Sequence, residues 1–321
     1  MKILVTGSNG QLGHEVMNEL ILRGHEAIGC GSKPSYSGTA DHSPVTKALY
    51  CQMNVTDPCA VGAVMDEVKP EAIVHCAAWT AVDSAELPEN REKAWALNVR
   101  GTQLLAEACA AQKAKMIYIS TDYVFDGSGE RPWKPDSHEC RPLNYYGLTK
   151  RQGELAVSST LDRFFVVRTA WLFGMAGNNF VKTMLKLGKT HPALRVVNDQ
   201  IGTPTYAADL GRLLADMVET DCYGTYHASN EGPYVSWYDF AKEIFRCAAD
   251  RGFPEYAERV IDIQPVSSAE YGASIAKRPL NSRLDKSKLT EKGFRLLPDW
   301  RDSLNTFMNQ YFAQEGKEQG R

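Results

Sequence analysis

The first thirteen residues constrain the fold most strongly, because they read as a buried strand that runs into a glycine-rich loop. Lys2 to Thr6 is a short apolar run, glycines follow at positions 7, 10 and 13, and apolar residues at helical spacing come next. Such glycines permit a tight turn, a close approach of the backbone to a diphosphate, and close packing of helix on strand. We therefore predict a dinucleotide site that includes Gly7, Asn9, Gly10, Gln11 and Leu12. A glycine-rich turn without a ligand is the alternative.

Strand-like and helix-like patterns then alternate through the first half of the chain. Further strands are predicted at 26–30, 48–53, 72–76, 116–120 and 164–169, with helical patterns between them, the longest at 89–112. This alternation predicts an α/β fold with a Rossmann-like, doubly wound parallel sheet. We expect residues 1–174, with returning segments at about 195–229, to form the dinucleotide-binding domain. Residues at about 175–194 and 230–321 then form a smaller, interleaved substrate-binding domain.

The end of the second predicted strand bears on the choice of cofactor. An NAD site needs an acidic residue there, which accepts hydrogen bonds from the adenosine ribose. This chain has Cys30-Gly31-Ser32-Lys33 at that point and no carboxylate before Asp41. A hydroxyl and an ammonium suit a 2′-phosphate, so Ser32 and Lys33 favour NADP(H) over NAD(H). The alternative is that Lys33 is only a solvated loop charge.

Three other segments are predicted to contact the cofactor. Asn54 and Val55 follow the third strand, where they can hold the edge and the face of the adenine. Small residues follow the fourth strand, at the edge where open parallel sheets bind ligands, and leave room for a ribose; they are Ala77, Ala78 and Thr80. Asn98 lies in the long helical pattern and is included as a cofactor contact. The alternative for Asn98 is a solvent-facing or locally bonded side chain.

Residues 120–150 carry the groups that can do chemistry. Thr121 follows the fifth predicted strand, and Tyr146 and Lys150 stand four positions apart on one face of the next helix. Beside a nicotinamide, Tyr146 can donate a proton to a carbonyl that receives hydride, and Thr121 can bond the developing oxyanion. An ammonium at Lys150, together with the cationic oxidised ring of the cofactor, is expected to favour the phenolate of Tyr146 and so to lower its pKa. We predict that all three residues are catalytic and that Tyr146 and Lys150 also contact the cofactor.

A tyrosine four residues before a lysine is weak evidence alone, and the chain contains a second such pair, Tyr238 and Lys242. No strand-end hydroxyl or glycine loop precedes that pair, so Tyr238 is predicted to pack. The first pair instead follows a long loop at 126–143 that contains three prolines. Long loops of this kind often act as lids, and the sequence leaves open whether this one closes on substrate.

Composition narrows the class of partner. A net charge of −3 gives no electrostatic reason to bind nucleic acid or an anionic membrane. The longest apolar runs are too short to span a bilayer, and no leader precedes the first strand, so a cytoplasmic location is expected. The eight cysteines and seven histidines show no paired spacing, so no metal site is predicted. A small molecule or a second copy of the chain is the expected partner.

Motifs spread over nearly the whole chain resemble the extended short-chain dehydrogenase/reductases, and within them the dTDP-4-dehydrorhamnose reductases. They are TGSNGQLG at 6–13, HCAAWTAVDSAE at 75–86, STDYVFDG at 120–127, YYGLTK at 145–150, RTAWLFG at 168–174, NDQIGTPT at 198–205 and RPLNSRL at 278–284. The resemblance implies reduction by NADPH of dTDP-4-dehydro-6-deoxy-L-mannose at C4, which gives dTDP-L-rhamnose. It also implies a homodimer, which is common in this family. The substrate-binding residues that it implies are Val82, Thr121, Asp122, Tyr123, Trp171, Gln200 and Arg278.

Two related activities differ at the residues that follow Thr121. The 4,6-dehydratases resemble Thr-Asp-Glu there, whereas this chain has Asp122 and Tyr123, so the elimination acid/base is missing. The 4-epimerases usually have Ser-Ser followed by small residues. Another nucleotide-sugar 4-reductase or epimerase is nevertheless an alternative. The regulatory subunit of methionine adenosyltransferase also resembles this family and binds NADP, so a non-catalytic binding role is a further alternative.

Overall fold

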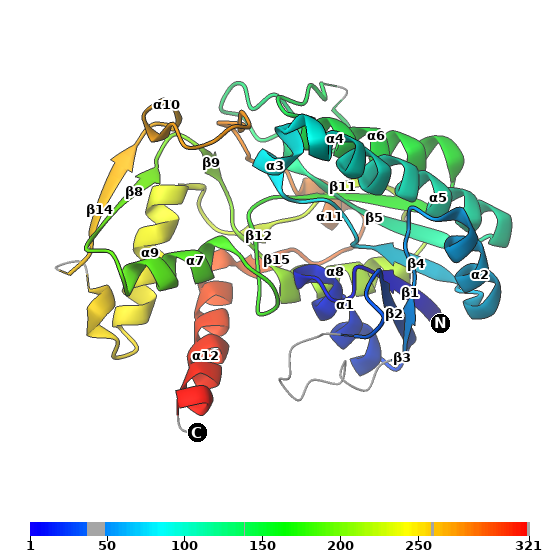
Figure 1. The fold of residues 1–321 in the computed structure, drawn as a ribbon, viewed down its shortest axis with the longest axis horizontal. Coiled ribbons are helices and arrows are strands. Elements are labelled where there is room, and N and C mark those ends of the chain that lie inside the picture. Colours follow the sequence, from blue (N-terminus) through cyan, green and yellow to red (C-terminus); the bar gives the residue numbers. More distant parts are fainter. Residues whose placement is uncertain (37–48, 138, 258–259, 320–321) are drawn as a thin grey trace.

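A seven-stranded parallel sheet organises the described residues, which are 1–36, 49–137, 139–257 and 260–319 of the computed structural model (Figure 1). Its strands are β1 (Lys2–Thr6), β2 (Glu26–Gly31), β3 (Leu49–Gln52), β4 (Ala72–His75), β5 (Lys115–Thr121), β6 (Phe164–Thr169) and β11 (Gly224–His227). Their spatial order is β11-β6-β5-β4-β1-β2-β3. The order reverses between β1 and β4, and sheets of this kind bind ligands at the carboxyl ends of the strands near that point. The predicted doubly wound sheet is confirmed. Position 48, where the third strand was predicted to begin, lies outside the described residues.

Helices cover both faces of this sheet (Figure 1). One face carries α1 (Gln11–Leu22) and α8 (Ala207–Val218), and the other carries α2 (Pro58–Val68), α5 (Gly101–Gln112) and α6 (Tyr145–Thr160). Ile3 and Val5 belong to the buried cluster of the first layer, whereas Leu4 belongs to that of the second. Successive side chains of a strand point to opposite faces, so a strand covered on both sides is apolar at every position.

The predicted helix at 89–112 is interrupted in the structure. It consists of α4 (Pro88–Trp95), a π-helical turn (Ala96–Arg100) and α5, and the short α3 (Val82–Glu86) precedes them. Asn98 lies in the π-helical turn and is only 1% exposed. Single π-helical turns inside α-helices often occur at functional sites.

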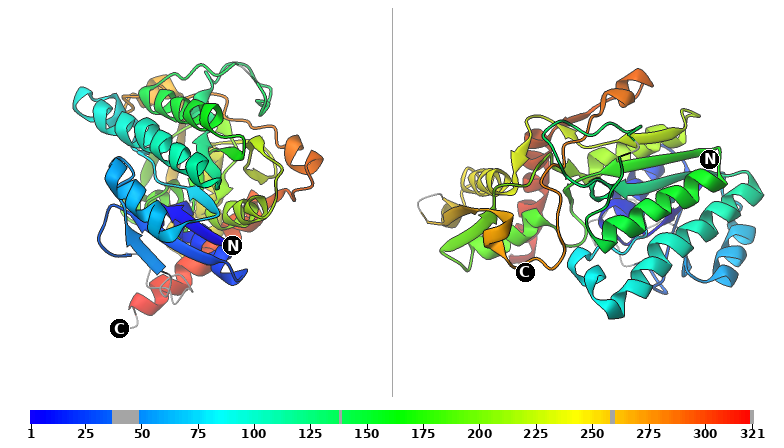
Figure 2. Two further views of the ribbon diagram at one scale, coloured as in Figure 1. Left: turned by 90° about the vertical axis from the view of Figure 1, so that its right-hand side faces the viewer. Right: turned by 90° about the horizontal axis from the view of Figure 1, so that it is seen from above.

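A smaller lobe lies beside one end of the sheet (Figures 1 and 2). It contains α7 (Phe180–Gly188), α9 (Trp237–Ala249), α12 (Trp300–Gln319), and the paired strands β8 (Ala193–Val197) and β14 (Asp262–Val266). The predicted boundaries placed residues 195–197 with the large sheet, and this was wrong. These residues belong to β8, because Leu194 and Val196 bury their side chains in the core of the smaller lobe.

Short elements complete the described chain. Two-stranded pairs are formed by β7 (Leu172–Phe173) with β10 (Thr205–Tyr206), β9 (Ile201–Gly202) with β13 (Val235–Ser236), and β12 (Asn230–Glu231) with β15 (Leu297–Asp299). The remaining helices are α10 (Ser268–Tyr271) and α11 (Ser287–Glu291), with 3₁₀ turns at Asp122–Val124 and Pro254–Tyr256. Among the helices of the described residues, none has both the length and the apolar character that a membrane crossing requires.

Candidate active site

Two adjoining cavities lie at the carboxyl edge of the sheet. The first, of about 570 Å³, is lined by Thr121, Tyr146 and Lys150 among others. The second, of about 440 Å³, is lined by residues that follow β1, β2, β3 and β4. Cys76 and Ala78 line both cavities. The structure therefore brings the predicted chemical groups and the predicted adenosine end into one continuous region.

The position of α6, which carries the predicted catalytic residues Tyr146 and Lys150, follows from its first residues. The side chain of Asn144 caps α6 by accepting a hydrogen bond of 2.7 Å from the backbone N–H of Gly147. A Cβ atom at Gly147 would lie 2.2 Å from the backbone oxygen of Tyr123. Only glycine therefore lets α6 approach the residues that follow β5. This approach places Tyr146 beside Tyr123, with ring centroids 5.7 Å apart.

The ionisation of Tyr146 differs from the prediction. Burial raises the pKa of Tyr146 above its ordinary value, although a hydrogen bond with Thr121 opposes the change. Lys150 does not produce the expected lowering, because its ammonium lies over the ring of Tyr118, 4.1 Å from the centroid. The expected contribution of Lys150 to a lower pKa of Tyr146 was therefore wrong. The phenol of Tyr146 is protonated at neutral pH.

Burial of Lys150 lowers the stability of the folded state. Burial lowers the pKa of Lys150 from 10.5 to about 7, even though Glu154 and Cys76 favour the charged form. Lys150→Met is therefore expected to raise the free energy of unfolding by about 3 kcal/mol at pH 7 while it removes a proposed catalytic group. This increase in the free energy of unfolding is smaller than the change in pKa alone implies, because methionine cannot make the contact of the Lys150 ammonium with the ring of Tyr118. Thermal unfolding over a series of pH values measures the effect.

The sign of this pH dependence follows from proton binding. Between pH 7 and 10.5 the unfolded chain holds the Lys150 proton more tightly than the folded chain does. The advantage of Lys150→Met should therefore be full below pH 7, shrink as the pH rises, and vanish above 10.5. Lys242→Met is a matched control, because Lys242 also lies over a tyrosine ring but is exposed. A stabilisation that does not change with pH would contradict this explanation.

The glycine loop has the close contacts that its predicted role requires. Gly7 has a φ of +65°, and a Cβ atom there would lie 2.7 Å from the backbone nitrogen of Ala77. A Cβ atom at Gly13 would lie 2.3 Å from the backbone oxygen of Gly7. The N–H of Gly10 closes the turn by donating to that same oxygen at 2.8 Å. The backbone of Gly7 therefore packs directly against that of Ala77, and both residues line the second cavity.

The predicted cofactor residues divide between the two cavities. Those that line the second cavity are Gly7, Asn9, Ser32, Lys33, Asn54, Val55, Ala77 and Ala78. Those that line the first are Gln11, Leu12, Ala78, Thr80, Tyr146 and Lys150. Gly10 lines neither cavity. Asn98 lines neither, because its amide bonds to protein groups: it donates to the oxygens of Trp79 and Thr149 and accepts from the N–H of Trp79. Asn98 therefore holds the loop after β4.

Five of the predicted substrate residues line the first cavity, namely Val82, Thr121, Asp122, Tyr123 and Trp171. Gln200 does not, because its side chain donates to the hydroxyl of Ser268 at 2.9 Å. Arg278 also lies outside the lining and forms an ion pair with Asp83.

Two aromatic residues of the first cavity were missed by the sequence reasoning. Trp237 begins α9 and stacks on Trp171, with ring centroids 3.7 Å apart, and Phe180 of α7 contacts the same ring of Trp237 at 4.5 Å. Trp171 has a φ of +51°, a strained value for a bulky residue, which surrounding contacts must hold in place. Ser236, whose side chain caps α9 by accepting from the backbone N–H of Asp239, is a signal from which the start of α9 could be predicted. The neighbouring Tyr238 and Lys242 line neither cavity.

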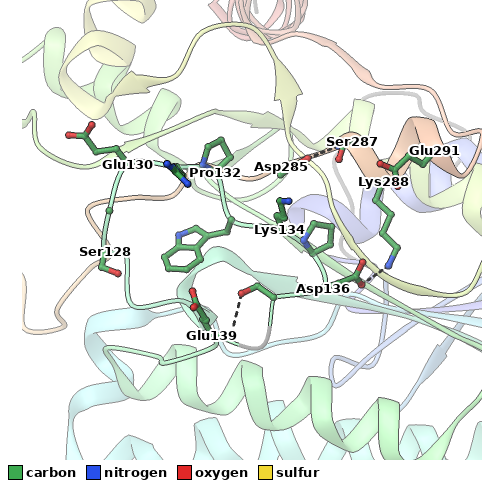
Figure 3. Close-up of a pocket in the computed structure, with 15 residues that line it drawn as sticks. Ser128, Glu130, Pro132, Lys134, Asp136, Glu139, Asp285, Ser287, Lys288 and Glu291 are labelled. Atoms are coloured by element: carbon green, nitrogen blue, oxygen red, sulfur yellow. Dashed lines mark hydrogen bonds and ion pairs between the residues drawn. The ribbon is translucent and has the colours of Figure 1, made fainter.

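The loop at 126–143 is tied to the rest of the fold at its middle. Trp133 stacks on Phe125 at 4.6 Å, and its backbone forms hydrogen bonds with Arg283 and Asp285. A larger cavity of about 780 Å³ lies between this loop and α11, where Asp136 forms an ion pair with Lys288 (Figure 3). None of its lining residues lines the other two cavities. The middle of the loop is therefore part of a separate, charged surface.

A doubly wound sheet with a glycine loop after β1, and with threonine, tyrosine and lysine in one cavity at its carboxyl edge, defines a short-chain dehydrogenase/reductase. The chain belongs to the RmlD substrate binding domain family, whose model matches residues 1–313.

Known proteins are similar over nearly the whole chain. A dTDP-4-dehydrorhamnose reductase from Aggregatibacter actinomycetemcomitans is 37% identical and covers 94% of this chain and 97% of its own length. A dTDP-4-keto-6-deoxy-D-glucose reductase from Streptomyces niveus is 34% identical and covers 94% of each. The crystal structure of a dTDP-4-dehydrorhamnose reductase from Bacillus anthracis, in complex with NADP, matches with a TM-score of 0.83 at 37% identity and covers 97% of this chain and 100% of that chain.

Proposed function

We propose that this protein reduces the C4 keto group of dTDP-4-dehydro-6-deoxy-L-mannose with NADPH and forms dTDP-L-rhamnose, a step of nucleotide-sugar biosynthesis. The observation that carries the proposal is that Thr121, Tyr146 and Lys150 line one cavity, which adjoins a second cavity with Ser32 and Lys33 in its wall. Relatives named dTDP-4-dehydrorhamnose reductase, at 37% identity over nearly the whole chain, support the choice of substrate.

The residues of the two cavities fit NADP(H). Gly7 and Gly13 leave no space for side chains, so amide groups rather than side chains can face a diphosphate. Ser32 and Lys33 offer a hydroxyl and an ammonium for a 2′-phosphate, which supports a preference for NADP(H) over NAD(H). Asn54 would hold the adenine. When bound, the cofactor supplies a hydride to the carbonyl carbon.

The residues of the first cavity supply the proton. Tyr146 is protonated at neutral pH, because burial raises its pKa, and this is the state that a general acid needs. Its O–H proton passes to the carbonyl oxygen as that oxygen gains negative charge. Thr121 donates a hydrogen bond to the same oxygen. The ammonium of Lys150 would favour the phenolate that remains only after it moves from the ring of Tyr118 toward Tyr146. Tyr123 occupies the position where a dehydratase needs a glutamate, so elimination lacks its acid/base.

The identity of the sugar has a second candidate. A relative that is 34% identical is named for the reduction of dTDP-4-keto-6-deoxy-D-glucose, which differs in the sugar and shares the C4 ketone. The proton chemistry of Tyr146 serves either ketone. Val82, Trp171 and Trp237 line the first cavity, and their contacts with the sugar ring would determine which of the two sugars is preferred.

The test is turnover of the purified chain with defined substrates. Loss of NADPH is followed with dTDP-4-dehydrorhamnose, with its GDP counterpart and with dTDP-4-keto-6-deoxy-D-glucose, and the product is identified by NMR. The proposal expects the highest kcat/KM for dTDP-4-dehydrorhamnose and dTDP-L-rhamnose as product. No turnover, together with tight binding of NADPH and of a protein partner, would support the regulatory alternative. A homodimer and a cytoplasmic location belong to the proposal as well, and light scattering tests the first of these.

A further inference from the structure

The turn at Ser32 and Lys33 is held by strand β3. The hydroxyl of Tyr50 donates to the backbone oxygen of Lys33 at 2.9 Å, and the side-chain amide of Gln52 donates to the backbone oxygen of Ser32 at 3.0 Å. Tyr50 and Gln52 are alternate residues of β3, so their side chains leave the same face of the strand. Two successive carbonyl groups of the turn are therefore fixed by one neighbouring strand.

Tyr50 also connects this turn to the glycine loop. Its hydroxyl forms a second hydrogen bond, with the side chain of Asn9. A Cβ atom at Gly31 would lie 3.2 Å from that hydroxyl, so a side chain at position 31 would crowd it. Asn9 and Lys33 both line the second cavity, whereas Tyr50 does not. Tyr50 therefore fixes the distance between the glycine loop at Asn9 and the turn at Lys33, although Tyr50 does not line the cavity itself.

Lys33 and Ser32 bring an ammonium and a hydroxyl to the wall of the second cavity. Within the described part of the chain, no carboxylate forms an ion pair with Lys33, which lies on the wall of the cavity together with Ser32. The two carbonyl oxygens of the turn are directed toward Tyr50 and Gln52. A carbonyl oxygen that faced the cavity would repel a phosphate, so these hydrogen bonds keep the electrostatic environment of the turn favourable to an anion.

We infer that Tyr50 and Gln52 are positioning residues that fix the Ser32–Lys33 turn for a 2′-phosphate and thereby set the selectivity for the phosphorylated cofactor. The inference rests on the proposed function, which makes NADP(H) the preferred cofactor. Tyr50 and Gln52 line neither cavity. They lie in β3, whereas Ser32 and Lys33, the proposed phosphate contacts, follow the neighbouring strand β2.

The test separates binding of the 2′-phosphate from binding of the rest of the nucleotide. Tyr50→Phe keeps the ring, whose centroid lies 6.0 Å from that of Tyr36, and removes only the hydroxyl. The dissociation constant of 2′-phospho-ADP-ribose should rise about fivefold, and that of ADP-ribose should change by less than about twofold. Both are measured by calorimetry on the full chain, without turnover.

Two further variants keep the test decisive. Gln52 is exposed, so Gln52→Ala examines the same turn without disturbing the core and should weaken the same ligand about threefold. Tyr223→Phe is the matched control, because Tyr223 is a half-buried tyrosine whose hydroxyl bonds to Asp221 near the amino ends of the strands. It should change neither ligand.

The outcomes distinguish the inference from the function on which it rests. If the unmodified protein binds ADP-ribose as tightly as its 2′-phosphorylated form, the proposed preference for NADP(H) fails, and the inference fails with it. If the unmodified protein prefers the phosphorylated form, but Tyr50→Phe and Gln52→Ala weaken both ligands equally or not at all, the inference alone is overturned. Selective weakening of 2′-phospho-ADP-ribose by both variants would support it.

Discussion

Tyr146→Phe should lower kcat by roughly 10²–10⁴-fold, because the variant lacks the proton donor for the carbonyl oxygen. The fold should survive, since the ring remains in its edge-to-face contact with Tyr123 at 5.7 Å. The KM for NADPH should change by less than about threefold, because the substitution removes an interaction that matters mainly in the transition state. Steady-state kinetics with dTDP-4-dehydrorhamnose and NADPH measure both constants.

The second tyrosine–lysine pair supplies the control for this experiment. Tyr238→Phe makes the same chemical change in α9, at a residue that lines neither cavity, and should leave kcat near that of the unmodified protein. Near-normal turnover in Tyr146→Phe would show that another group delivers the proton. Loss of turnover in a folded Tyr238→Phe would place the chemistry in the smaller lobe.

Local patterns were sufficient to predict the sheet and to select residues that the structure brings to one edge of it. The first strand has its predicted bounds, Lys2–Thr6, because a strand buried on both faces must be apolar throughout and the glycine that follows must end it. The edge of the sheet then gathers residues from distant parts of the sequence. Since Thr121 and the start of α6 meet at that edge, the pair Tyr146 and Lys150 could be separated from its decoy by context alone.

The features that the sequence did not reveal depend on contacts between distant segments. Trp171 and Trp237 are far apart in the sequence, and their stacking depends on a left-handed backbone at Trp171 and on the docking of the smaller lobe. Strand β8 was misplaced for a similar reason, because its partner β14 comes much later in the chain. The contribution of Lys150 to the pKa of Tyr146 was mispredicted because its ammonium lies over the ring of Tyr118, a position that no spacing pattern reports.

A buried ion pair links β6 to α6, the helix that carries Tyr146 and Lys150. Glu154 of α6 accepts two hydrogen bonds from Arg168 of β6, at 2.7 and 2.8 Å, and both side chains are 3% exposed. Ser120, which precedes the proposed catalytic threonine, donates to the same carboxylate at 2.6 Å. Arg168 also donates to the backbone oxygen of Pro135 in the loop at 126–143. Removal of the Glu154 carboxylate would leave the Arg168 guanidinium buried without its acidic partner, which is costly. Glu154 itself has a second basic partner, Arg151, at 2.7 Å.

Glu154→Gln should therefore lower the free energy of unfolding by about 4 kcal/mol and the Tm by roughly 8 °C. Burial raises the pKa of Glu154, but the hydrogen bonds from Arg168 and Ser120 outweigh it and hold that pKa below its ordinary value. A lowered pKa means that the stabilisation is present at neutral pH and is lost as the pH falls through the folded-state pKa. Urea unfolding at neutral and at acid pH should show a large difference from the unmodified protein only at neutral pH.

Two comparisons decide whether the unpaired charge causes this loss. Asp250→Asn breaks the exposed pair of Arg246 and Asp250, whose side chains are 58% and 60% exposed, and should cost less than about 1 kcal/mol. The double variant Glu154→Leu/Arg168→Met removes both buried charges and should be more stable than Glu154→Gln, because no buried charge is then left without a partner. If the double variant is instead less stable than Glu154→Gln, the hydrogen bonds of Arg168 to the loop stabilise the fold more than the ion pair does.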